Sequence, residues 1–272
     1  MAKKKGSKGP HSYFKESNKL HDSVGSFDGG ACLNGHLSRW VERDSCSYRW
    51  QGIKRAKERA ELYNIPSERS WWLDESGFRW LSAESVAKGR SGKILKTIAE
   101  GIKKGMLKRK VEVRNFTNGF LPYSNQVHHV LPNSALRKGI EGATGSKANL
   151  IKDITDGLLE EPYNINFKIN MLILPEGKRE SVILGLPTHC GDHPGYTAKV
   201  MASVKAAMQP YALAAKKGEP HGESDFEDIK DELHTISNDM YDAVVDYGQA
   251  SVKGASALSV NELPTSVFSV LA

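Results

Sequence analysis

The sequence has few cysteines and no long apolar run, and each shortage excludes a class of protein. Its 272 residues include 3 cysteines, Cys32, Cys46 and Cys190, too few and too scattered for the disulfide framework of a small secreted domain. A zinc site built from Cys32, His36 and Cys46 would lack a second cysteine–histidine pair, so we expect ordinary buried thiols. No stretch approaches the roughly 20 apolar residues that a membrane helix needs, so we expect no membrane association.

The basic N-terminal residues have no apolar segment behind them, which is the part of a secretory signal that crosses the membrane. No signal peptide is therefore expected, and the chain is expected in the cytoplasm where it is made. Its net charge is +6 and its pI is about 9.0. The positive charge is concentrated between Lys88 and Arg114, whereas acidic residues dominate between Glu219 and Asp246. A basic stripe suits a polyanion such as nucleic acid, although a solvated helix face is the more common explanation for charge alone.

Periodicity divides the chain into helical and extended parts. Apolar residues at three-and-four spacing predict helices from Leu37 to Tyr63, from Ile94 to Met106 and from His193 to Pro210. Short apolar runs predict strands at Asn125–Leu131 and Met171–Leu174. The acidic C-terminal stretch is expected to form a helix capped by Ser224, with a buried stripe made of Phe226, Ile229, Leu233, Ile236, Met240, Val244 and Tyr247.

Five polar residues fall at the ends of the predicted strand–strand–helix unit: His128, His129, Asn170, His189 and His193. The run NQVHHVLPN places two histidines side by side, and a strand directs neighbouring side chains to opposite faces. His189 and His193 are four residues apart at the start of a predicted helix. On a helix, that spacing places both imidazoles on one face, as a shared metal ion requires.

The blocks HHVLP, NMLILP and HCGDHPGY, in this order, resemble the AHH family of nucleases, a branch of the HNH (ββα-metal) endonucleases. The resemblance covers about residues 125–205. Val127 stands where the family has alanine and Met171 where glycine is usual, and both departures change packing and not chemistry. The resemblance implies an α+β fold: a mostly helical chain containing a ββα-metal, HNH-like finger.

The resemblance also implies roles for the polar residues. His128, His189 and His193 would bind one divalent metal ion, and His129 would be the general base, although the roles of the two adjacent histidines could be exchanged. Asn170 would bond the backbone around His129 and fix its ring. Three imidazoles suit zinc or nickel better than magnesium, which the wider superfamily often uses. The identity of the metal stays open.

Four regions follow: a flexible basic arm (1–20), a basic, mostly helical region (21–114), the nuclease domain (115–215), and an acidic amphipathic C-terminal helix with its tail (216–272). The implied function is metal-dependent endonuclease activity on DNA, with RNA as the less favoured substrate. Basic side chains close in sequence to the site could contact phosphates; they are Arg137, Lys138 and Lys199.

Members of the AHH family are largely toxin domains of bacteria, so the resemblance implies an antibacterial effector with a cognate immunity protein. Such a protein could reach target cells through a specialised secretion system. The alternative function is a catalytically inactive HNH-like module that binds metal or nucleic acid.

Overall fold

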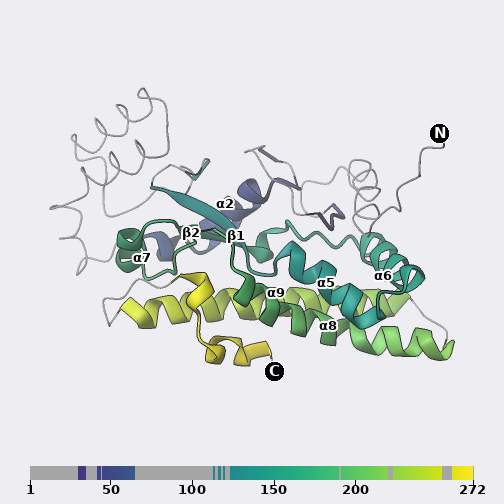
Figure 1. Ribbon diagram of the computed structural model, residues 1–272. Coiled ribbons are helices and arrows are strands. Elements are labelled where there is room, and N and C mark those ends of the chain that lie inside the picture. The colour runs from purple at the N-terminus through teal and green to yellow at the C-terminus, as the bar shows by residue number, and fades with distance from the viewer. Residues whose placement is uncertain are drawn as a thin grey trace, which may run out of the picture.

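The computed structural model describes residues 30–34, 42–43, 45–64, 113, 116–117, 119, 123–189, 191–219, 223–252 and 259–271 (Figure 1). The basic arm at residues 1–20, the helix expected at residues 94–106 and Cys190 lie outside the described residues. Cys32 and Cys46 are buried free thiols, as expected.

A two-stranded antiparallel sheet lies at the centre of the fold. Strand β1 (Asn125–His129) pairs with β2 (Met171–Pro175), and the register places His128 opposite Leu172. Every residue of β2 is buried, which explains its continuous apolar sequence. Both strands were predicted; β1 ends two residues before Leu131 and β2 includes Pro175.

Along the chain, helices precede β1, connect β1 to β2 and follow β2. Before β1 come α2 (Tyr48–Glu58) and η2 (Ala60–Tyr63). Between the strands lie α5 (Asn133–Thr144), α6 (Ala148–Glu160) and η5 (Lys168–Asn170). After β2 come α7 (Lys178–Leu184), α8 (Pro194–Lys217), α9 (Glu223–Val252), η6 (Val260–Glu262) and η7 (Thr265–Leu271). The α+β prediction is confirmed, and β1, β2 and α8 form the expected ββα unit.

Three helix boundaries differ from the sequence prediction. Residues 42–43 and 45–46 are turns, and α2 begins only at Tyr48 because the Ser47 side chain accepts a hydrogen bond from the Trp50 N–H. Helix α8 continues through Pro210 and ends at Lys217, followed by the left-handed cap residue Gly218. Helix α9 runs from Glu223 to Val252, so the backbone of Ser224, the expected cap, is already within the helix.

Helix α5 packs directly against α8, the helix that follows His193. A Cβ atom added at Gly139 would lie 2.5 Å from Cγ1 of Val204 and 2.9 Å from its Cβ. Any larger residue at Gly139 would therefore push the two helices apart. Because α5 begins just after β1, this close packing helps to fix the start of α8 relative to the first strand.

The acidic C-terminal helix is part of the core. Its predicted stripe is confirmed, since Leu233, Met240 and Val244 are fully buried, with Phe226 and Tyr247 packed at its edges.

In the part of the chain that the structure describes, no helix is both long and apolar enough to span a membrane.

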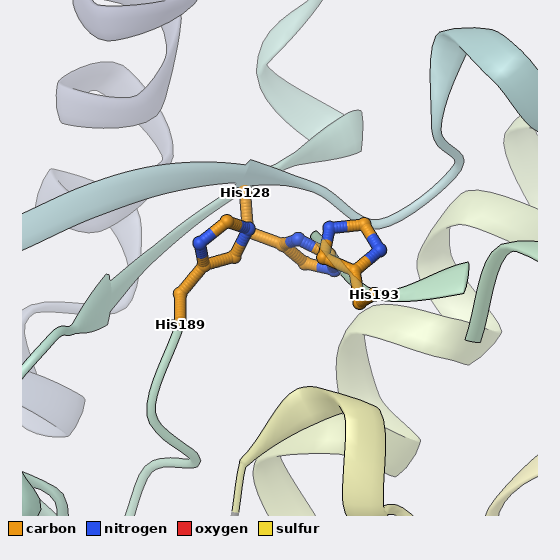
Figure 2. Close-up of side chains that lie close together, drawn as sticks. All are labelled: His128, His189 and His193. Carbon is orange, nitrogen blue, oxygen red and sulfur yellow. The ribbon is translucent and has the colours of Figure 1, made fainter. Parts of the chain in front are cut away.

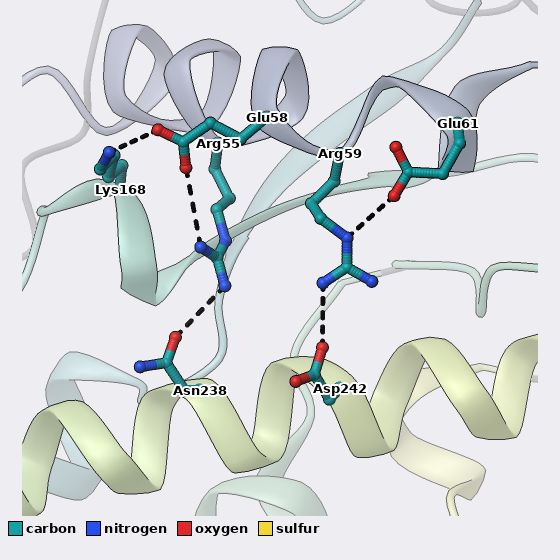
Figure 3. A network of polar contacts seen from close by, with 7 residues as sticks. All are labelled: Arg55, Glu58, Arg59, Glu61, Lys168, Asn238 and Asp242. Atoms are coloured by element: carbon teal, nitrogen blue, oxygen red, sulfur yellow. Dashed lines mark hydrogen bonds and ion pairs between the residues drawn. The ribbon is translucent and has the colours of Figure 1, made fainter.

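Polar contacts join α2 to α9 (Figure 3). Arg55 donates to Asn238 Oδ1 at 3.2 Å, and Arg59 donates to Asp242 Oδ1 at 3.1 Å. The Arg55 guanidinium also lies 4.6 Å from the centre of the Tyr241 ring. An exposed ion pair such as that of Arg59 with Asp242 contributes about 0–1 kcal/mol, so these contacts mainly fix how α2 lies on α9.

Candidate metal centre and catalytic site

His128 of β1 meets His189 and His193, which both lie between β2 and α8, beside the sheet. Figure 2 shows the rings of His128, His189 and His193 directed toward one another. One nitrogen of each lies within 4.8 Å of the corresponding nitrogens of the other two. The ring centroids are 4.8–5.0 Å apart. The residues that the sequence predicted as metal ligands are therefore brought together by the fold.

His189 and His193 approach each other through a turn and not along a helix. The backbone N–H of His189 donates to the Pro175 carbonyl at 2.8 Å, which ties it to the end of β2. Helix α8 begins only at Pro194, so His193 is its N-cap. Between the histidines, Gly191 has a φ of 79°, a conformation that favours glycine. The expected reason for their proximity, a shared helix face, is wrong.

The cluster contains buried polar atoms without partners. His128 is 1% exposed, and neither of its ring nitrogens has a hydrogen-bond partner among the described residues. Nδ1 of His189 also lacks a partner in this part of the chain. A buried donor or acceptor left without a partner costs about 1–3 kcal/mol. Ligation of one cation would give each of the three rings a partner for one of its nitrogens, so the residues fit a metal ion.

Burial lowers the pKa of all three imidazoles. The pKa of His128 lies well below its ordinary value, because the ring is desolvated and because His189 and His193 repel a charge there. Burial, with a contribution from His193, lowers the pKa of His189 to about 4. Burial also lowers the pKa of His193. All three rings are therefore neutral at neutral pH, which is the form that binds a metal ion.

His129 faces the opposite side of β1. Its Nε2 lies 3.0 Å from Oδ1 of Asn166, and its ring centroid is 5.4 Å from that of Tyr48 on α2. Burial is the main cause of the lowered pKa of His128 and His189, but the charge of His129 also contributes to both. The His129 ring thus lies within electrostatic range of the cluster, and it is half-buried.

Asn170 fixes the chain just after His129. Its side chain accepts from the Leu131 N–H at 2.6 Å and donates to the Leu131 carbonyl at 3.0 Å. It also donates to the Ile165 carbonyl at 2.8 Å, and its own carbonyl accepts from the Val130 N–H at 3.0 Å. These bonds hold the backbone that follows β1. The contact with the His129 ring is made by Asn166 and not by Asn170.

Tyr196 of α8 packs against two histidines of the cluster. Its ring centroid is 5.1 Å from that of His128 and 5.4 Å from that of His193. Its hydroxyl donates to the Val130 carbonyl, so the helix is bonded to the end of β1. These contacts pack the start of α8 against the first strand.

A hollow of about 410 Å³ opens beside His193. Ser134 and Lys138 of α5 line it, with Asp192 and Thr197 from the other side. A larger hollow of about 700 Å³ lies between α8 and α9, but no histidine lines it. The smaller hollow is the candidate substrate site, because a cationic side chain, Lys138, and a histidine of the cluster, His193, both line it.

The three basic residues expected near substrate have different surroundings. Lys138 is exposed and lines the hollow beside His193. Lys199 instead donates to Thr265 Oγ1 at 3.3 Å and lies 4.5 Å from the centre of the Phe268 ring. Arg137 is half-buried and does not line this hollow. Of the three, Lys138 has the position that suits a phosphate contact.

Sequence reasoning missed Asn166 and Tyr48. Asn166 is fully buried, and the alternation of asparagine with apolar residues in YNINF was the available signal for it. Nothing in the sequence of α2 pairs Tyr48 with a histidine far along the chain.

A comparison with models of known protein families agrees with the resemblance seen in the sequence. Residues 109–233 match AHH, described as a nuclease family of the HNH/ENDO VII superfamily with conserved AHH. Neither the curated proteins nor the solved structures that were searched gave a match. The matched segment contains both strands, the histidine cluster and α8. Residues 109–233 of this chain therefore belong to the AHH family of nucleases.

Proposed function

We propose that the protein is a metal-dependent endonuclease that hydrolyses phosphodiester bonds of DNA. One observation carries the proposal: His128, His189 and His193 converge with one nitrogen of each within 4.8 Å of those of the other two. Both ring nitrogens of His128 and Nδ1 of His189 are buried without partners among the described residues. A divalent ion held there would supply positive charge to the scissile phosphate and to the leaving oxygen. Imidazole ligands suit zinc or nickel.

The chain's own residues divide the remaining work. His129 is the general base, because a neutral imidazole takes a proton from water near neutral pH. Asn170 holds the backbone behind it through its two bonds with Leu131. Lys138 contributes a phosphate contact in the hollow beside His193.

Plasmid digestion tests the reaction and its metal requirement. Protein freed of metal by a chelator should leave supercoiled DNA intact, and added zinc, nickel or magnesium should restore nicking with at least one of them. Calorimetric titration should find one ion bound per chain. Absence of cleavage of duplex DNA, single-stranded DNA and RNA with every ion would refute the enzyme and leave the metal-binding or nucleic-acid-binding module.

Chelation also separates catalysis from a purely structural ion. A structural zinc site unfolds when its metal is removed. We expect the far-ultraviolet circular dichroism to persist in chelator, because the buried apolar core extends over most of the described elements.

A toxin role follows from the family and extends the proposal. Induced expression inside bacterial cells should arrest growth and fragment chromosomal DNA, whereas expression of His129→Ala should do neither. Growth arrest with intact DNA and degraded RNA would indicate that the substrate is RNA and not DNA. Unimpaired growth with the active enzyme would contradict a toxin, and with it the expected immunity protein and delivery to target cells.

A further inference from the structure

The side-chain amide of Asn166 has a fixed orientation. It is fully buried, and its Nδ2 donates to the Asn34 carbonyl at 2.8 Å. A carbonyl oxygen can only accept, so the amide nitrogen must face Asn34. The amide oxygen must then face His129, whose Nε2 lies 3.0 Å away.

This orientation determines the tautomer of His129. An amide oxygen cannot donate, so Nε2 of His129 has to carry the hydrogen that joins the two. A neutral imidazole has one N–H and one lone pair. The lone pair of His129 is therefore placed on Nδ1.

The Asn34 carbonyl, which accepts from Asn166, belongs to a segment before the matched residues 109–233 and is held by residues within them. Cys32 forms a parallel bridge with Asn164: its N–H donates to the Tyr163 carbonyl, and its carbonyl accepts from Ile165, each at 2.8 Å. Asn133 donates to the Leu33 carbonyl at 2.6 Å, which fastens the same short segment to α5. Residues 31–34 therefore lie firmly against the loop that carries Asn166.

We propose that Asn166, oriented by the Asn34 carbonyl, is a positioning residue that holds the His129 proton on Nε2 and so presents Nδ1 as the base. The proposal rests on the proposed role of His129 in the nuclease. It adds that a segment before the family region, residues 31–34, takes part in arranging the catalytic histidine.

Two substitutions at Asn166 separate positioning from folding. Asn166→Leu removes both the donor to Asn34 and the acceptor for His129, whereas Asn166→Asp removes the donor and keeps an acceptor oxygen. Both should lower the thermal midpoint, since each removes the buried hydrogen bond from the Asn166 side chain to the Asn34 carbonyl. Only the leucine variant should lower kcat by about 10- to 100-fold, with KM unchanged, as loss of an orienting partner does. The aspartate variant should retain most of kcat.

Nuclear magnetic resonance of the zinc-loaded protein, labelled with ¹⁵N in histidine, gives a readout that does not depend on cleavage. Above the ordinary imidazole pKa, the wild type and Asn166→Asp should show a slowly exchanging Nε2–H for His129, and Asn166→Leu should lose it. A proton on Nδ1 in the wild type would overturn the proposal, as would an unchanged kcat in the leucine variant of an active enzyme. A wild type that cleaves nothing, yet shows the protected Nε2–H, would refute the nuclease and leave the hydrogen bond standing.

Discussion

Replacement of His129 by alanine is expected to lower the rate constant for plasmid cleavage by about 10²- to 10⁴-fold, the usual contribution of a general base. The ring of His129 faces Asn166 and Tyr48 and not the three-histidine cluster. Its removal should therefore leave one divalent ion bound per chain with little change in affinity. Single-turnover cleavage and metal titration of the same preparation measure the two effects separately.

His234→Ala is the matched control for this experiment. His234 is a half-buried histidine on α9 that contacts the rings of Tyr163 and Phe167 and has no contact with the cluster. The control should cleave at the wild-type rate. If His129→Ala loses the metal and His128→Ala retains it, His129 is the metal ligand and His128 is the base. Full cleavage by His129→Ala would exclude it as the base.

The parts of the fold that follow from local patterns were predictable. Strands β1 and β2 are short apolar runs, and the stripe of α9 repeats at three-and-four spacing, so each could be recognised without its neighbours. The first predicted strand contained His128, and the predicted helix from His193 to Pro210 had His189 and His193 at its start. The convergence of these residues depends on strand pairing and on the Gly191 turn, for which the sequence offered the right residues but the wrong reason.

The parts that depend on distant segments were not predictable. Asn166 contacts His129 across 37 positions and is oriented by Asn34, 132 positions before it. Neither pairing has a periodic signature, because hydrogen bonds between loops are set by the completed fold. The extent of α8 was missed for a related reason: burial of Tyr211 and Ala212 against the core sustains the helix beyond Pro210, where local propensity predicts an end.

The contacts between α2 and α9 give the flanking regions a role in the architecture of the site. Arg55 and Arg59 bind α9, and the Tyr63 hydroxyl donates to the Ile173 carbonyl of β2 at 3.3 Å. Helix α2 also carries Tyr48, which contacts the His129 ring. The acidic C-terminal helix therefore supports α2, the element that lies against the His129 ring.

Replacement of His128 by leucine is expected to stabilise the metal-free protein while abolishing metal binding and cleavage. Both ring nitrogens of His128 are buried without partners among the described residues, so the imidazole destabilises the metal-free fold by about 1–3 kcal/mol. Leucine has a similar size and no polar atom to leave unsatisfied. In chelator, denaturant unfolding should therefore give a larger free energy of unfolding for the variant than for the wild type.

Added zinc should reverse that order. Ligand binding to the folded state alone stabilises the wild type, by about 2.7 kcal/mol when the free ion is at 100 times its Kd, whereas the variant should not respond. His189→Leu is the matched comparison: that ring is only partly buried, so its replacement should stabilise the metal-free protein less while still removing the response to zinc. If His128→Leu unfolds more easily than the wild type in chelator, the imidazole contributes to the metal-free fold. The cluster would then be a packing feature, and the metal centre would lose its main support.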